Sequence, residues 1–289
     1  MPVYNQVLTP DYSLYHGDSV EILADLPSNS IDYIIFSPPF SSLYTYSDSE
    51  HDHGNCRGDA EFFTQYRFLS TELFRVLKPG RLMSVHCMML PYSKQNTGHL
   101  GLNDFPGHLR QHHEEDGFLL HSHVTIWKDP VMQMQRTKSI GLLYKQVRKD
   151  ATISRQGLPD FVYTFVKPGI NPDPVTHASD DLPLERWQRY ASPVWMDINP
   201  SDTLQRTSAR EDADERHIAP LQLQVIERCI DLWTNPGDIV LDPYGGIGST
   251  PYVAVRMERK AVACELKASY YRQMVANCAQ ANAQLTLQF

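Results

Sequence analysis

IVLDPYGGIGST, residues 239–250, is the stretch that decides the fold. Its β-branched start predicts a short buried strand, its glycines a tight turn, and residues 249–256 a helix, followed by a strand at 261–264 that ends at Glu265. Gly245, Gly246 and Gly248 let the backbone approach a ligand closely, and a helix N-terminus then faces that ligand. Glu265 is placed to accept hydrogen bonds from ribose hydroxyls. The stretch predicts half of a nucleotide-cofactor site. The alternatives are a purely structural turn and an NAD site, although its spacing is not GxGxxG.

The rest of the chain alternates strands and helices in the same way. Residues 32–36 read as a fully buried strand, and 61–77 carry apolar residues at helical spacing up to the stop signal Lys78-Pro79-Gly80. Ser19 is the predicted N-cap of a short helix after Gly17-Asp18, and Asp18 is the alternative cap. Further strands are expected at 14–16, 82–86 and 123–127, and further helices at 20–26, 105–116, 220–233 and 267–280. This alternation predicts βα units and an α/β fold with a mostly parallel sheet.

The strand at 32–36 ends in Ser37-Pro38-Pro39-Phe40, which we call the 37–40 elbow. Its two prolines fix φ and remove backbone donors, so the chain leaves the sheet in a rigid, extended conformation. The Ser37 hydroxyl and the carbonyls of Ser37 and Pro38 are then held at the C-terminal end of a strand, where open α/β sheets bind their ligands. An ordinary Pro-Pro turn is the alternative.

The segment from 128 to 168 differs in charge from the rest of the chain. Residues 128–160 hold seven Lys or Arg residues against three Asp, in a protein whose net charge is −8. Clustered cations track phosphates, and the glutamines here offer amides to base edges, so we expect the nucleic-acid face in this segment. A solvated charged segment is the alternative. Six of the seven cations are predicted to contact DNA: Arg136, Lys138, Lys145, Arg148, Lys149 and Arg155. Residues 168–216, rich in Pro, Asp and Ser, read as a linker that wraps over the surface or becomes ordered with ligand.

Composition limits the remaining classes. The chain has 289 residues, 42% of them hydrophobic, which is enough for one large α/β domain with insertions or two small domains. No apolar run approaches the length of a membrane span and the N-terminal residues do not resemble a signal peptide, so a cytoplasmic location is expected. The five cysteines form no CxxC pair, which argues against disulfides and structural zinc. The histidines near 51–53 and 108–123 are interpreted as loop and surface residues, and no metal is expected.

The 37–40 elbow near one end of the chain and DPYGGIGST near the other together resemble the amino-methylating DNA methyltransferases of the β order. In that order the catalytic motif comes first, the target-recognition region follows, and the cofactor turn comes last. Residues 244–248, YGGIG, are similar to the FxGxG turn of S-adenosylmethionine methyltransferases, with Tyr244 in place of Phe. Gly17-Asp18, ERHIAP at 215–220 and Glu265-Leu266-Lys267 resemble further cofactor motifs of the family. Residues 46–56 and 127–161 also resemble a solitary, phage or prophage subgroup.

The resemblance implies a fold and a cofactor. The fold is the Rossmann-like fold of S-adenosylmethionine-dependent methyltransferases, with a mostly parallel, seven-stranded-type sheet, helices on both faces, a circularly permuted motif order and an inserted target-recognition region. Residues 1–127 are then the catalytic half, 128–216 the target-recognition and linker region, and 217–289 the cofactor-binding half of one domain. The implied cofactor is S-adenosyl-L-methionine, held by Asp18, His217, Asp242, Tyr244, Gly245, Gly246, Gly248, Ser249, Thr250 and Glu265.

The resemblance also implies a reaction, in which a base flipped out of double-stranded DNA offers its exocyclic amine to the sulfonium methyl. The Ser37 hydroxyl and the Pro38 carbonyl would accept the two amine N–H bonds, Pro39 would keep the elbow rigid, and Phe40 would stack on the base. Ser37 at the first position favours cytosine N4, with adenine N6 as the second choice. Two further hypotheses are a DNA-binding module without catalysis and a methyltransferase of RNA or small molecules.

The expected partner is double-stranded DNA, with a homodimer as an option and no membrane contact. The sequence does not say whether a partner restriction nuclease exists.

Overall fold

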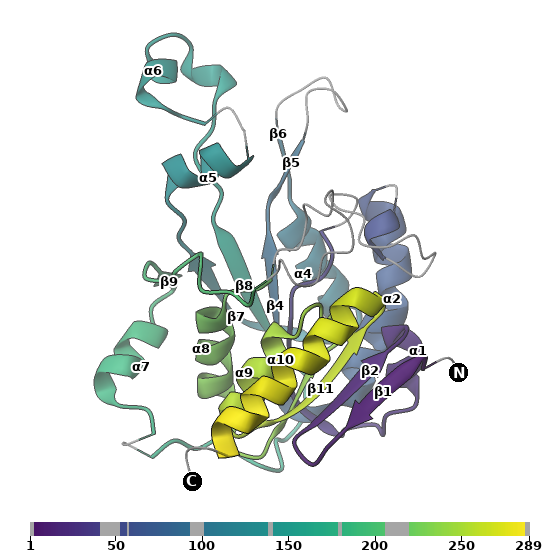
Figure 1. The fold of residues 1–289 in the computed structure, drawn as a ribbon. Coiled ribbons are helices and arrows are strands. Elements are labelled where there is room, and N and C mark those ends of the chain that lie inside the picture. Colours follow the sequence, from purple (N-terminus) through teal and green to yellow (C-terminus); the bar gives the residue numbers. More distant parts are fainter. Residues whose placement is uncertain are drawn as a thin grey trace.

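The computed structural model describes residues 3–40, 53–56, 58–92, 101–137, 141–178, 181–205 and 220–286. Its centre is a nine-stranded sheet with the order β1-β2-β11-β10-β3-β4-β8-β7-β9 (Figure 1). The strands are β1 (Asn5–Leu8), β2 (Tyr12–His16), β3 (Ile31–Phe36), β4 (Leu77–Met88), β7 (Leu119–Ile126), β8 (Asp160–Val166), β9 (Val194–Trp195), β10 (Ile239–Asp242) and β11 (Lys260–Glu265). A separate pair, β5 (Leu90–Tyr92) and β6 (Gly101–Asn103), extends beyond the end of β4.

The strands β2, β11, β10, β3 and β4 are parallel neighbours, whereas β8 is antiparallel to both β4 and β7, and β1 is antiparallel to β2. The predicted α/β fold with a mostly parallel sheet is therefore confirmed. Because parallel strands end at the same edge, the C-terminal ends of β2, β3, β4, β10 and β11 meet there, and β7 ends at that edge too.

Helices cover both faces of the sheet. On one face pack α8 (Leu223–Trp233), α9 (Ser249–Arg256) and α10 (Ala268–Thr286), and on the other α1 (Ser19–Ala24), α2 (Asp59–Val76) and α4 (Phe105–Glu115). The central strand β3 is buried on both sides, since Tyr33 and Ile35 face the first set of helices while Ile34 and Phe36 face the second. This is why its sequence is an unbroken apolar run instead of an alternating one.

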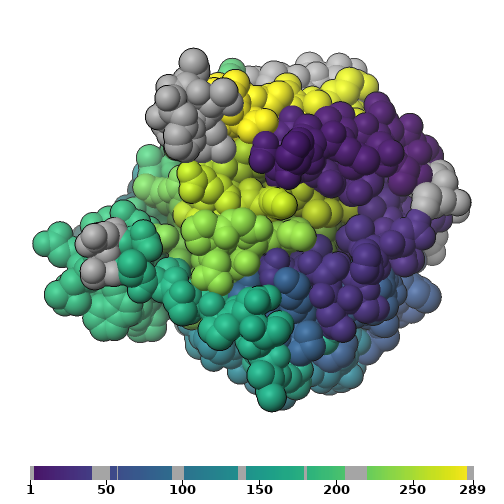
Figure 2. Space-filling view, turned by 90° about the horizontal axis from the view of Figure 1, so that it is seen from below, coloured from purple at the N-terminus to yellow at the C-terminus, as the bar shows by residue number. Residues whose placement is uncertain are grey.

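The two ends of the chain are neighbours in the sheet. The strand β10 lies between β3 and β11, and β11 in turn pairs with β2. In Figure 2 the purple atoms of the N-terminal strands accordingly lie against yellow and yellow-green atoms of the C-terminal part. Arg81, only 2% exposed, reinforces this junction: it donates to the carbonyl of Asp32 at 2.9 Å and forms ion pairs with Asp32 and Asp238.

Three details differ from the sequence-based expectations. The strand β4 begins at Leu77, directly after α2, so Lys78-Pro79-Gly80 lie within a strand, where Gly80 has φ +73°. Asp18, and not Ser19, is the N-cap of α1, because its Oδ1 accepts from the N–H of Val20 at 2.7 Å. Asp is among the preferred N-cap residues because its carboxylate accepts from an N–H group of the first turn.

The third difference is that the segment 128–216 contains more regular structure than its composition suggested. It includes α5 (Pro130–Thr137), α6 (Tyr144–Val147), α7 (Leu184–Tyr190), β9 and the strand β8, which lies between β4 and β7. Trp195 of β9 is 2% exposed, so part of the predicted linker contributes to the core. The division of the chain at residues 127 and 216 stays a prediction, and β8 shows that the inserted segment also completes the sheet.

No helix within the described ranges is both long and apolar enough to cross a bilayer. The same ranges hold no group of three or more His, Cys, Asp or Glu side chains arranged to bind a metal ion. All five cysteines are buried as free thiols.

Candidate active site

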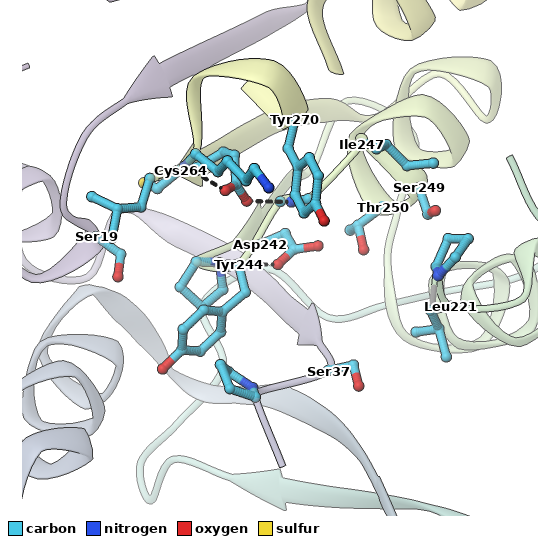
Figure 3. Close-up of a pocket in the computed structure, with 18 of the residues that line it drawn as sticks. Ser19, Ser37, Leu221, Asp242, Tyr244, Ile247, Ser249, Thr250, Cys264 and Tyr270 are labelled. Atoms are coloured by element: carbon cyan, nitrogen blue, oxygen red, sulfur yellow. Dashed lines mark hydrogen bonds between the residues drawn. The ribbon is translucent and has the colours of Figure 1, made fainter. Parts of the chain in front are cut away.

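A pocket opens where β2, β3, β10 and β11 end (Figure 3). Ser37 lies at one end of it and Tyr270 at the other, with Asp242 and Tyr244 between them. The predicted site residues that line the pocket are Asp18, Ser37, Pro39, Asp242, Tyr244, Gly245, Gly246, Ser249, Thr250 and Glu265. The sheet topology has thus brought together two motifs that lie about 200 residues apart in the sequence.

Some predicted residues stand apart from this lining. Pro38, Phe40 and Gly248 do not line the pocket; Pro38 and Gly248 are buried and Phe40 is half-buried. His217 falls outside the described residues. The pocket also has walls that the sequence did not indicate, including Ile247 and Tyr270 from the C-terminal part of the chain.

The glycines shape the turn after β10. Gly248 has φ +92°, and a Cβ there would lie 2.9 Å from Met274 of α10. A Cβ on Gly245 would lie 2.8 Å from the sulfur of the same methionine. The N–H of Gly245 donates to the carbonyl of Cys264 at 2.8 Å, which joins the turn to the end of β11. Glycine is therefore required for close packing as well as for backbone conformation.

Glu265 organises the same turn from the next strand. Its Oε2 accepts from the N–H of Gly246 at 2.8 Å, and its Oε1 accepts from the N–H of Lys267 at 2.7 Å. A carboxylate oxygen has two lone pairs and can accept more than one hydrogen bond. The side chain thus fixes the turn and faces the pocket at once.

Asp242 is a buried acid of the pocket with a strongly raised pKa. The side chain is 5% exposed, and burial raises its pKa to about 6, although bonds from the Thr250 hydroxyl and the Tyr244 N–H, the latter at 2.9 Å, act in the opposite direction. A buried carboxylate with few cations near it favours a positively charged ligand group. Asp18 also lines the pocket while it caps α1.

Tyr244 has a partner that the sequence did not identify. Its hydroxyl lies 2.6 Å from Nδ1 of His53, a residue that is 8% exposed and also lines the pocket. The two residues are 191 positions apart, so only the general expectation that a buried tyrosine hydroxyl finds a partner pointed to such a contact. The bond connects the Gly-rich turn to the short segment 53–56.

The 37–40 elbow presents a polar and an aromatic group. The Ser37 Oγ lies 3.0 Å from Nδ1 of His86 on β4. Phe40 is half-buried and packs edge-on against Phe105 at a centroid distance of 6.1 Å, with the His86 ring 6.2 Å away. Part of the Phe40 ring is therefore left to stack on a planar ligand.

His86 is backed by an acid and a cation from neighbouring strands. Its Nε2 lies 3.1 Å from Oδ2 of Asp160, within ion-pair distance but outside the angle of a good hydrogen bond. The same Oδ2 lies 2.5 Å from Nζ of Lys128. Burial alone would raise the pKa of Asp160, but His86 and Lys128 outweigh it and hold that pKa below its ordinary value. Asp160 is thus ionised at neutral pH.

The predicted DNA-binding cations fall on and around α6, which projects from the body of the protein (Figure 1). Lys145, Arg148 and Lys149 are exposed, next to the exposed ring of Tyr144. Arg155 is half-buried and donates to the carbonyl of Gln156 at 3.1 Å. The predicted residues not placed are Lys138, outside the described ranges, and Arg136, whose side chain is not described.

Comparison with known proteins agrees with this geometry. The chain is 26% identical over 264 residues to the Type II methyltransferase M.BamHI of Bacillus amyloliquefaciens, an alignment that covers 88% of this chain and 54% of that protein. Two solved structures share the fold. The putative DNA modification methylase TTHA0409 of Thermus thermophilus, complexed with S-adenosyl-L-methionine, has a TM-score of 0.69 and 21% identity, covering 94% of this chain and 96% of that one. The cytosine-N4-specific PvuII DNA methyltransferase has a TM-score of 0.65 and 19% identity, covering 96% and 93%.

The motif order in the sequence and the fold of these structures indicate the same family. A family model described as DNA methylase, of the N6/N4 type, matches residues 31–276. The chain belongs to the N6/N4 family of DNA methylases.

Proposed function

We propose that the protein transfers the methyl group of S-adenosyl-L-methionine to the N4 amine of a cytosine flipped out of double-stranded DNA. One observation carries the proposal: the 37–40 elbow and the Gly-rich turn, distant in sequence, end at the same pocket. Since M.BamHI is matched over about half its length, the activity of the whole protein is inferred from this site and from the family.

The pocket suits the proposed cofactor in the chemistry of its donors and acceptors. Glu265 offers carboxylate oxygens suited to ribose hydroxyls, and Asp242 offers a buried negative charge suited to the cationic methionine end. When bound, S-adenosylmethionine supplies an electrophilic methyl group on a sulfonium. Asp18 and the glycines would complete the binding surface, and His217 stays a predicted contact.

The base would be held by the elbow. The Pro38 carbonyl and the Ser37 hydroxyl accept the two N–H bonds of the amine and orient its lone pair, which would otherwise be delocalised into the ring. Phe40 stacks on the base. Ser37 supports cytosine. Adenine N6 is the alternative acceptor.

The exposed cations near α6 would contact DNA phosphates. The helix α5 follows β7, whose end lies at the same edge of the sheet as the pocket, so a duplex bound there can deliver a flipped base to the elbow. The resemblance to solitary phage methyltransferases remains a prediction, which the genes adjacent to this one would test.

The deciding experiment incubates the protein with methyl-labelled S-adenosylmethionine and duplex DNA of varied sequence, then identifies the modified nucleoside by mass spectrometry. We expect N4-methylcytosine. Recovery of N6-methyladenine would assign the other base, and recovery of no methylated base would refute the proposed activity. Ser37→Ala should abolish most of the signal, whereas His108→Gln, on the exposed side of α4, should preserve it.

A further inference from the structure

We infer that His86, supported by Asp160, takes up the proton that the target amine loses, with the Ser37 hydroxyl as the relay between them. The inference rests on the proposed function and names proton acceptors that neither sequence motif contains. It assigns a role in turnover to residues of β4 and β8, two strands that contribute no residue to either motif.

The geometry fixes the direction of the hydrogen bonds. Ser37 donates its O–H to Nδ1 of His86 at 3.0 Å, because a neutral imidazole that faces a carboxylate carries its hydrogen on Nε2. The protonated Nε2 then lies 3.1 Å from Oδ2 of Asp160, within ion-pair distance. With its own hydrogen directed at His86, the Ser37 oxygen presents lone pairs to an incoming amine N–H.

His86 lies close to two charged side chains. Charged groups face the imidazole from two other elements: the Asp160 carboxylate at the start of β8, and behind it the Lys128 ammonium that follows β7. His86 and Asp160 are 8% and 2% exposed, so their interaction is weakly screened. Asp160 carries a charge opposite to that of an imidazolium, and Lys128 carries the same charge as an imidazolium.

The step balances without any further reactant. The amine nitrogen forms a bond to the methyl carbon as the carbon–sulfur bond breaks, and the electron pair of that broken bond goes to sulfur, which becomes a neutral thioether. The methylated nitrogen is now positively charged and must lose one proton. That proton passes to the Ser37 oxygen while the Ser37 proton passes to Nδ1 of His86, and the imidazolium later releases it to water. The Pro38 carbonyl accepts a hydrogen bond but cannot take the proton, and a serine hydroxyl alone is too weak a base.

The test is the rate of methyl transfer in a single turnover, with saturating cofactor and DNA, from about pH 5 to about pH 8. For the wild type we expect the rate to fall on the acid side as His86 becomes protonated. His86→Gln should be ~100-fold slower and should lose this acid limb, while its affinities for cofactor and DNA stay unchanged. His108→Gln is the matched control, because His108 also pairs with an aspartate, Asp59 at 3.2 Å, but on α4 away from the pocket.

Asp160→Asn provides a second and independent readout. It removes the charge that stabilises the imidazolium and leaves Lys128 facing it, so the acid limb should shift to lower pH and the plateau rate should fall. If Asp160 had a purely structural role, its replacement would not shift the pH at which the rate falls. Should His86→Gln fail to fold, as judged by cofactor binding, the shift in Asp160→Asn decides alone. Unchanged acid limbs in an active wild type and in these variants would overturn the inference, whereas an inactive wild type would refute the proposed function itself.

Discussion

Replacement of Glu265 by Gln should weaken the turn and the cofactor site together. The carboxylate accepts from the N–H groups of Gly246 and Lys267 at 2.8 and 2.7 Å. Gln keeps one acceptor oxygen, but its NH₂ group must then face one of the two backbone N–H groups. A hydrogen bond to a charged group contributes ~1.5–3 kcal/mol, so loss of one such bond should lower the free energy of unfolding of the cofactor-free protein by about that amount.

Cofactor affinity should fall as well, because the turn must be ordered on binding and the ribose loses a charged acceptor. If the same ~1.5–3 kcal/mol appears in binding, the dissociation constant rises ~10- to ~150-fold. Urea unfolding without cofactor measures the first effect and calorimetric titration with S-adenosylmethionine the second. Glu258→Gln, an exposed carboxylate before the same strand, is the control. Wild-type values for both quantities in Glu265→Gln would refute the assigned role.

Three further predictions concern other parts of the site. Tyr244→Phe removes the 2.6 Å bond to His53 and should lower the free energy of unfolding in urea by ~1–3 kcal/mol. In the His53→Ala background the same substitution should cause no further loss. Burial raises the pKa of Asp242 from 3.8 to about 6. The stability that this carboxyl contributes is therefore present below pH ~4 and lost as pH rises through about 6. Asp242→Asn should accordingly stabilise the free protein near neutral pH by up to ~3 kcal/mol and have little effect near pH ~4, and wild-type cofactor affinity should fall as pH drops through about 6. Replacement of Lys145 and Arg148 by Glu should weaken duplex binding and reduce the salt dependence, by ~0.9 in log–log slope for each phosphate that the variant no longer neutralises, without changing cofactor affinity.

The parts of the site that were predictable from the sequence are those that local chemistry specifies. Gly245 and Gly248 are needed because a side chain would collide with α10, and the 37–40 elbow follows from two prolines after a buried strand. Such requirements act within a few residues, so they leave a readable pattern. The order of the two motifs then places both at the same edge of a parallel sheet, which is a topological consequence and needs no knowledge of contacts.

The remaining contacts depend on which strands become neighbours. His53 meets Tyr244 and His86 meets Ser37 across 191 and 49 positions, and neither histidine differs in its local sequence from a structural one. The strand β8 escaped prediction for a related reason. It lies in a segment whose cations and glutamines resemble a surface, although its own residues 160–166 are apolar enough to pair with β4 and β7.

The choice of serine at position 37 explains why a histidine and an acid from other strands are present behind it. A carboxylate at this position could bind the amine N–H and accept its proton directly. A serine hydroxyl can accept the same hydrogen bond but is too weak a base to keep the proton. The base must therefore lie one hydrogen bond further from the amine, which is where His86 lies, next to Asp160. Burial of charged side chains stabilises a fold little, because their desolvation costs free energy. If Ser37 alone were the acceptor, the buried group of His86, Asp160 and Lys128 would have no evident function. In the inferred relay, the elbow and the β4–β8 pair therefore divide binding and proton uptake between two side chains.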